Sequence, residues 1–134
     1  MNDQYLSDEG YALMGAAFEV YKEIGHGLAE EIYQESLEIE LELRSIEFTP
    51  KAELQTYYKG RLLKKKYIPD LIISGEIVTE LKSVRELMPD HESQLLNYMR
   101  LTKKAVGYLI NFGPAGGVEW KRYILKEFIP HNDV

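Results

Sequence analysis

The hydrophobic pattern of this chain changes its period near residue 47, and this change limits the possible folds more than any other feature. Before it, apolar residues recur at helical spacing: Leu13, Ala17, Tyr21 and Ile24, then Tyr33, Leu37 and Leu41. After it, residues 48–82 alternate between apolar or aromatic and polar side chains, with turn signals at Lys59-Gly60 and Ser74-Gly75. The sequence therefore predicts two helices followed by three strands in a meander.

Capping and breaking residues set the expected limits of the two helices. The first helix is expected to begin after "LSDEG", where Ser7 or Asp8 can cap its free amides. It should end at about Ile24, because the "GHG" segment that follows contains two glycines. The second helix is expected over residues 28–44, with Glu31, Gln34, Glu35, Glu38 and Glu42 pointing outward.

The last third of the chain adds one helix and two strands. The segment "MPDHESQLLNYMRLT" predicts a helix opened by Pro89 or Asp90. Residues 105–113 predict a buried strand, and residues 118–125 predict a last strand. This order of elements is typical of an α+β fold, in which helices flank a mixed β-sheet.

Length and composition are those of an ordinary globular domain. The chain has 134 residues, of which 45% are hydrophobic and 28% charged, so we expect one domain over residues 1–134. It contains no cysteine, which excludes disulfides, thiolate nucleophiles and cysteine-bound metals. No apolar run approaches the roughly 20 residues that span a bilayer, and the acidic N-terminus is unlike a signal peptide. We therefore expect a cytoplasmic protein without membrane contact.

Charge is distributed unevenly along the chain. The formal net charge of −6 argues against broad binding of nucleic acid, which depends on lysines and arginines. Residues 28–47 hold seven glutamates against Arg44, whereas residues 51–66 hold six basic residues against Glu53. The basic segment "YYKGRLLKKK" would suit a nucleic-acid strand through stacking and phosphate contacts. It would equally suit a solvated hairpin whose lysines discourage association between sheets.

The apolar hairpin "YIPDLIISGEIVTELKS" (residues 67–83) carries three charged side chains that need an explanation. Glu80 and Lys82 share one face of the second arm, because side chains alternate along a strand. A three-residue loop over residues 74–76, with Gly75 left-handed, would pair Asp70 directly with Glu80. A two-residue turn would put Asp70 on the opposite face. We expect the three-residue loop, or a bulge with the same effect.

Two adjacent carboxylates in an apolar sheet repel each other and must be neutralised. A shared proton, the ammonium of Lys82 or a divalent cation could do this. Oxygen ligands suit Mg²⁺ or Mn²⁺, and the lysine could then orient water or stabilise a phosphate. Glu30 is a candidate third carboxylate, because helical spacing puts it on the inward side with Tyr33, whereas Glu31 faces solvent. A favourable interaction with the helix dipole would also explain Glu30.

Several segments together resemble one known family. "GLAEEIY" (residues 27–33) fits a G-x-x-E-x-x-Y pattern, and "AAFEVYKEIGHG" and "QLLNYMRLTKKAVGYLINFG" are similar to the same family. Over roughly residues 8–113 the sequence resembles the GxxExxY proteins of the PD-(D/E)xK nuclease superfamily. The resemblance implies a restriction-endonuclease-like αβββαβ core, a mixed sheet flanked by helices.

The resemblance also implies roles for individual residues. Asp70 and Glu80 would bind the metal, Mg²⁺ or Mn²⁺, with the backbone carbonyl of Leu81 as a further ligand. Lys82 would position the attacking water or stabilise the transition state. Glu30 would contact the metal directly or through water, and Gln94 could orient water or a phosphate.

Two functions follow as hypotheses. The first is a metal-dependent nuclease that acts on nucleic acid, with DNA as the expected substrate, using water activated by Mg²⁺ on Asp70 and Glu80, with Lys82 assisting. The alternative is a non-catalytic binding or assembly module that has kept the nuclease fold, with the charged groups as a structural ion pair. A homodimer is possible through the strand expected over residues 118–125.

Overall fold

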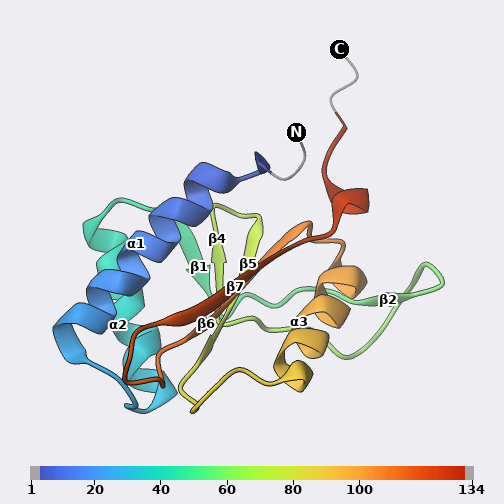
Figure 1. The fold of residues 1–134 in the computed structure, drawn as a ribbon. Helices are drawn as coiled ribbons and strands as arrows, with labels where there is room; N and C mark the ends of the chain where they lie inside the picture. The colour runs from blue at the N-terminus through green and yellow to red at the C-terminus, as the bar shows by residue number, and fades with distance from the viewer. Residues whose placement is uncertain (1–3, 132–134) are drawn as a thin grey trace.

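The computed structural model describes residues 4–131, and over these residues the chain forms three α-helices and seven strands (Figure 1). In chain order they are α1 (Ser7–Ile24), α2 (Glu30–Leu43), β1 (Phe48–Pro50), β2 (Tyr57–Tyr58), β3 (Arg61–Leu62), β4 (Leu71–Ile73), β5 (Ile77–Lys82), α3 (Pro89–Thr102), β6 (Val106–Asn111) and β7 (Glu119–Ile124), followed by the short 3₁₀-helix η2 (Lys126–Phe128). Every helix and strand expected from the sequence is present, with shifted limits in some cases.

Five strands form one mixed sheet in the order β1-β4-β5-β6-β7. Strands β5 and β6 are parallel and are joined through α3, whereas the other neighbouring strands are antiparallel. Strand β5 therefore lies in the centre, and β1 and β7 form the edges. This mixed sheet flanked by helices confirms the expected α+β fold class.

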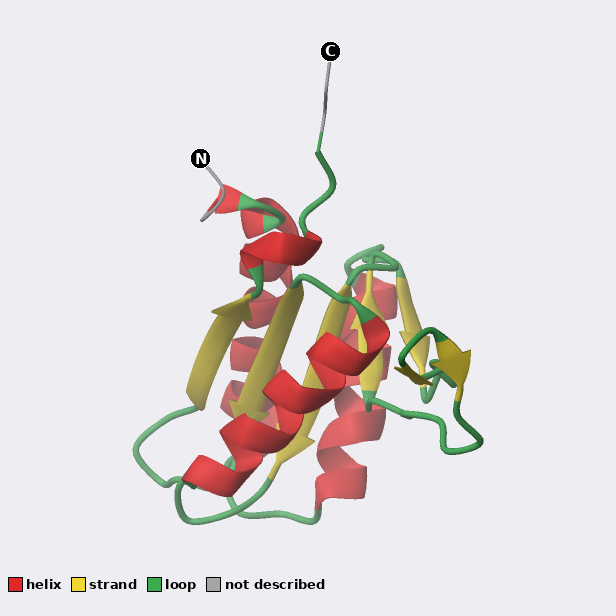
Figure 2. Ribbon diagram, turned by 90° about the vertical axis from the view of Figure 1, so that its right-hand side faces the viewer, coloured by secondary structure: helices red, strands yellow, loops and turns green. Residues whose placement is uncertain are grey.

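Helices cover both faces of the sheet (Figure 2). Helices α1 and α2 pack on one face, where their buried residues meet Ile77 and Leu81 of β5. Helix α3 packs on the other face, where Leu95 and Met99 meet Val78. Because both faces are covered, β4 and β6 are buried along their whole length. The alternation along β5 decides which layer each of its side chains enters.

The expected three-strand meander is present in an interrupted form. Strand β1 pairs with β4, but between them the chain forms a long hairpin with a bridge at Leu54 and Tyr67 and the strands β2 and β3 near its tip. Lys59 and Gly60 make its turn, both with positive φ, as the turn signal predicted. We call residues 55–66 the basic hairpin; it extends past α3, on the side of the sheet where that helix lies (Figure 1).

The helix limits differ from the expected ones at their N-terminal ends. Neither Ser7 nor Asp8 caps α1: Leu6 precedes it in a left-handed conformation, and no side chain caps its amides. Helix α2 begins at Glu30, because Gly27 has a positive φ of 74° and Ala29 is extended. None of the helices found among residues 4–131 is long and apolar enough to cross a membrane.

Candidate functional site

The register between β4 and β5 confirms the predicted hairpin. Leu71 pairs with Thr79 and Ile73 with Ile77, so residues 74–76 form a three-residue loop in which Gly75 has a φ of 73°. Continuing this register by one pair places Asp70 beside Glu80. The backbone N–H of Asp70 indeed lies 3.4 Å from Oε1 of Glu80.

Asp70 is held by three neighbouring segments. Its Oδ2 accepts a hydrogen bond of 2.7 Å from the backbone N–H of Leu81, and its Oδ1 lies 2.6 Å from the ammonium of Lys51. Burial lowers the pKa of Lys51, but its hydrogen bond to Asp70 and the nearby carboxylate charges outweigh burial and raise this pKa overall. Gln34 of α2 donates from Nε2 to the carbonyl of Asp70 at 2.9 Å. The carboxylate therefore has a fixed position and a positive partner.

Glu80 lies in a more apolar environment. The Tyr67 hydroxyl donates to its Oε2 at 2.5 Å, and the Tyr67 ring stacks on Tyr98 with 4.2 Å between ring centroids. Burial, together with the charge of Asp70, raises the pKa of Glu80 to about 7, although the Tyr67 hydrogen bond lowers it. Burial and the Glu80 charge also raise the pKa of Tyr67, which keeps that hydroxyl protonated. In this structure Lys51 and the raised pKa of Glu80, and not Lys82, limit the repulsion between the two acids.

Two cavities open on either side of this pair. The first, here called the acidic cavity, has a volume of about 530 Å³ and is lined by Leu28, Ala29, Glu30, Glu31, Gln34, Lys51, Asp70, Leu81 and Ser83. The second, here called the basic cavity, has a volume of about 310 Å³ and is lined by Lys65, Lys66, Tyr67, Ile68, Glu80, Lys82, Gln94 and Tyr98.

The six residues predicted from the sequence divide between these cavities: Glu30, Asp70 and Leu81 line the acidic one, and Glu80, Lys82 and Gln94 the basic one. Because side chains alternate between the two faces along β5, Leu81 faces the acidic cavity while Glu80 and Lys82 face the basic one. Asp70 precedes the first residue of β4, so the ladder does not hold its side chain on the Glu80 face. Within residues 4–131, no group of three or more His, Cys, Asp or Glu side chains is arranged to hold a metal ion.

Two expectations about α2 need correction. Glu30 is exposed and does not point into the core; Glu31 is exposed, as expected, and both residues line the acidic cavity. The first turn of α2 lies at the rim of the cavity, so neighbouring residues both reach it. Gln34, which was also expected to point outward, is half-buried and binds Asp70.

The glycine and tyrosine of the G-x-x-E-x-x-Y pattern place the start of α2 at this rim. Tyr33 is fully buried and stacks on Phe112, with 4.3 Å between ring centroids, and its hydroxyl donates to the carbonyl of Gly25 at 2.6 Å. Gly27 donates its N–H to the carbonyl of Phe112 at 3.1 Å. These two residues act structurally, and they leave Glu30 exposed at the cavity.

A buried asparagine fixes the segment that follows Lys82. Oδ1 of Asn111 accepts hydrogen bonds from the N–H groups of Val84 and Gly113 at 2.9 and 3.0 Å. Its Nδ2 donates to the carbonyl of Val84 and to Oε1 of Glu119, both at 3.0 Å. Because Asn111 is fully buried, these bonds are shielded from water. They hold the chain between β5 and α3, and so the relative positions of Lys82 and Gln94.

The site contains three residues that were not expected from the sequence: Gln34, Lys51 and Tyr67. Lys51 lies opposite Asp70 when the β1–β4 register is continued, and its N–H donates to the Asp70 carbonyl at 3.2 Å. Counting back from the Lys59-Gly60 turn would pair Lys51 with residue 68, because the register shifts by two between the hairpin tip and the Leu54–Tyr67 bridge. Tyr67 lies three residues before Asp70. Its hydroxyl reaches Glu80 only because the folded hairpin brings the two segments together.

Comparisons with known proteins agree with this architecture. The crystal structure of SSO0001 shares the fold, with a TM-score of 0.56 and 23% sequence identity over 70% of this chain; the chain spans half the length of that structure. No curated protein matches the sequence. A family model described as "PD-(D/E)XK nuclease superfamily" matches residues 7–123. Since this match covers most of its length, the chain belongs to the PD-(D/E)XK nuclease superfamily, whose members are usually nucleases.

Proposed function

We propose that this protein is a metal-dependent nuclease of the GxxExxY type that hydrolyses phosphodiester bonds in nucleic acid, with DNA as its substrate. One observation carries the proposal: the hairpin register sets Asp70 and Glu80 side by side, with Lys82 two residues further along β5. Membership of a nuclease superfamily supports the same chemistry.

The donor set suits a hard divalent cation such as Mg²⁺ or Mn²⁺. Asp70 and Glu80 supply carboxylate oxygens, which are the ligands these ions prefer. The Leu81 N–H points to Asp70, and in a strand the carbonyl of a residue points to the same side. That carbonyl lies beyond the first residue of β4, so it is available as a third ligand. Glu30, at the rim of the acidic cavity, would act through water.

The chain's own groups would then complete the reaction. A bound divalent cation supplies Lewis acidity and lowers the pKa of water at the site. Among residues 4–131, no group makes a hydrogen bond or ion pair with the ammonium of Lys82. This ammonium can therefore balance the negative charge that develops on the phosphoryl oxygens. Gln94 lines the same cavity and can orient the phosphate or the attacking water.

Removal of the Asp70 charge tests the proposal. Purified protein is incubated with labelled DNA and RNA in Mg²⁺ or Mn²⁺, beside Asp70→Asn and the control Glu76→Gln. Glu76 is an exposed acid of the hairpin loop that lines neither cavity. Asp70→Asn should reduce the cleavage rate by roughly 10²-fold or more, because the cation loses its main ligand. Equal cleavage by all three proteins would indicate a contaminating nuclease and remove the proposal.

The ion pair between Lys51 and Asp70 favours a second candidate, a non-catalytic module in which the charged groups are structural. In that case the ammonium of Lys51 already neutralises the charge of the Asp70 carboxylate. Calorimetric titration with Mn²⁺ separates the two functions. Saturable binding that disappears in Asp70→Asn would exclude the non-catalytic version.

We also propose that a second copy pairs along the edge strand β7. Leu125 donates its N–H to Ala105 of the β6 side, so the backbone groups of the even-numbered residues of β7 point outward. In an antiparallel pair with twofold symmetry, one residue of β7 can lie opposite its own copy. When that residue is Trp120, Glu119 lies opposite Lys121 of the second copy. Neighbouring registers set Lys121 or Arg122 opposite itself. Sedimentation analysis should show a dimer that Trp120→Glu dissociates; a monomeric wild type would refute this pairing.

A further inference from the structure

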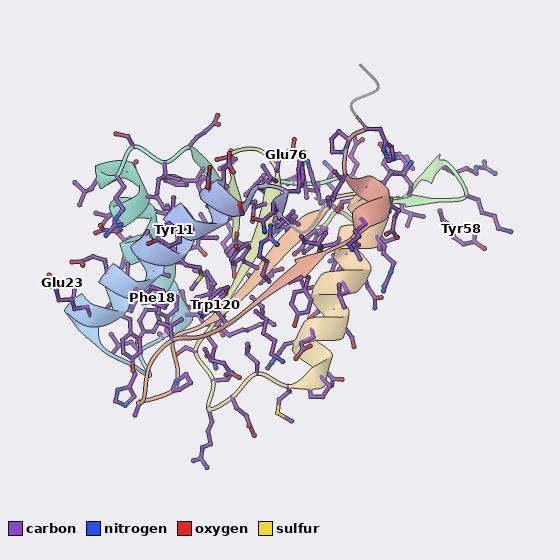
Figure 3. All side chains as sticks on the ribbon, turned by 45° about the horizontal axis from the view of Figure 1, so that its top comes forward. Tyr11, Phe18, Glu23, Tyr58, Glu76 and Trp120 are labelled. Carbon is purple, nitrogen blue, oxygen red and sulfur yellow. The ribbon has the colours of Figure 1, made fainter. Side chains whose placement is uncertain are left out.

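The basic hairpin concentrates positive charge and exposed aromatic rings in an otherwise acidic protein. It holds Lys59, Arg61 and three consecutive lysines, whereas the whole chain carries a net charge of −6. The Tyr58 side chain is 62% exposed, and the ammonium of Lys59 lies 5.5 Å from the centre of its ring. Figure 3 shows Tyr58 at the end of the hairpin, on the other side of the molecule from Tyr11 and Phe18. Exposed rings beside cations are the elements with which proteins bind unpaired nucleotides.

The hairpin is nonetheless firmly attached to the body. Leu54 and Tyr67 exchange two backbone hydrogen bonds of 2.8 and 2.9 Å at its base. The side chain of Thr56, which is buried, donates to the carbonyl of Lys65, and the Thr56 carbonyl accepts the N–H of Leu63 at 2.9 Å. The charges and rings of the hairpin therefore have defined positions relative to the site.

Three adjoining cavities lead from the site to the hairpin tip along α3. The basic cavity contains Lys82 and shares Gln94 and Tyr98 with a second cavity on α3. That second cavity shares Leu101 with a third, of about 620 Å³, which lies between the end of α3 and the hairpin tip.

The third cavity adds further positive charge and a further ring. Arg100 and Lys103 of α3 line it together with Tyr57 and Lys59 of the hairpin. From Gln94 to Leu101 the path is roughly 10 Å along the helix. This distance corresponds to about three nucleotides of a stacked strand.

The opposite side of β5 would repel a polyanion. The acidic cavity presents Glu30, Glu31 and Asp70, and the only cation lining it, Lys51, is already paired with Asp70. A phosphate backbone therefore approaches Glu80 and Lys82 from the α3 side, where the lysines lie.

We propose that the basic hairpin and the groove along α3 bind a single-stranded segment of nucleic acid, with Tyr58 stacking on a base, and lead it to Lys82. The purpose assigned to this binding rests on the proposed nuclease function. The binding itself can be measured without cleavage. A strand bound in this way needs unpaired bases, so single-stranded DNA should bind more tightly than the matching duplex.

A matched pair of variants tests the hairpin. Binding of fluorescent dT12 is followed by anisotropy in EDTA, which prevents metal-dependent cleavage. The hairpin variant is Tyr58→Ala with Lys59→Gln, and the control is Tyr11→Ala with Lys22→Gln. Tyr11 is 84% exposed on α1 and Lys22 is also exposed, so both variants lose one exposed ring and one charge. The hairpin variant should bind about tenfold or more weakly, whereas the control should match the wild type.

The outcomes separate this inference from the nuclease proposal. An equal loss in both variants, no loss in either, or tighter binding of duplex than of dT12 would overturn the hairpin inference. Metal-dependent cleavage together with hairpin-independent binding would leave the nuclease proposal intact and remove only this one. Hairpin-dependent binding without any cleavage would support the hairpin inference and remove the nuclease proposal. Circular dichroism of both variants checks that the fold is retained.

Discussion

The two cavities beside β5 each include residues of this strand, Leu81 in one and Glu80 and Lys82 in the other, yet they differ in charge. On the α2 side, Glu30, Glu31 and Asp70 surround one lysine that is already paired. On the α3 side, Lys65, Lys66 and Lys82 surround Glu80, whose pKa is raised to about 7. The acidic side suits a cation, and the basic side suits a polyanion.

The difference teaches how a short hairpin can serve two ligands of opposite charge. Alternation along β5 sends Leu81 to one face and Glu80 and Lys82 to the other. Asp70, just before β4, is free of that alternation and turns its carboxylate towards the acidic side while its backbone stays beside Glu80. The two acids therefore remain neighbours although they line different cavities.

The largest expected effect comes from a variant on the basic side that should lose cleavage activity but keep its affinity for the metal. Lys82→Met should reduce the cleavage rate by roughly 10²- to 10³-fold, because it removes a charge aimed at the phosphoryl group. Its affinity for Mn²⁺ should stay as in the wild type, since Lys82 lines only the basic cavity. Cleavage kinetics and calorimetry measure the two quantities. If Mn²⁺ affinity falls together with the rate, the division between the sides is wrong.

The next prediction concerns the cost of burying Glu80 on the basic side. Its pKa is raised from an ordinary 4.5 to about 7, so the folded state binds more protons than the unfolded state between these pH values. The stabilisation is fully present below pH 4.5 and is lost as pH rises through 7. The free energy of unfolding should fall by about 3 kcal/mol over this range through this group alone.

Urea unfolding in EDTA, at pH 4.5 and pH 8, checks this loss. The change with pH in Glu80→Gln should be smaller than in the wild type by that amount, because glutamine has no proton to lose. Parallel changes in the two proteins would mean that Glu80 ionises in the folded state as freely as in the unfolded one.

The smallest expected effect sharpens the comparison on the acidic side. The ammonium of Lys51 competes with a cation for Oδ1 of Asp70, so Lys51→Met should bind Mn²⁺ more tightly. The gain should be no more than about fivefold, because more than half of the lysine side chain is exposed and its ion pair is screened. Weaker binding in this variant would instead assign Lys51 a supporting role at the site.

Much of the fold could be predicted because local patterns agree with the final structure. The helical stripe of Tyr33, Leu37 and Leu41 is fully buried, as its spacing predicted. The loop over residues 74–76 follows from the preference of Gly75 for positive φ, and it decided the register that puts Asp70 beside Glu80. These features follow from patterns among residues close in sequence.

The features that were missed depend on contacts between distant segments. The start of α2 did not follow its helical pattern, because the loop before it bonds to Phe112 of a remote strand end. Gln34 was assigned to solvent from its helical position, whereas it binds the carbonyl of Asp70, 36 residues away. The hydrophobic spacing along a helix does not show whether a polar side chain of that helix is buried against a partner from another segment.

The order of elements, the register of the central hairpin and the charged residues on it could all be derived from local sequence patterns. These follow from strand alternation, glycine conformation and helical spacing, which act within a few residues. The pairing of Lys51 with Asp70, the bond between Tyr67 and Glu80 and the division into an acidic and a basic side arise from the packing of the folded chain. The physical reason is that charge and burial depend on which segments pack together, and that packing joins α2, β1 and α3 around β5 from distant parts of the chain.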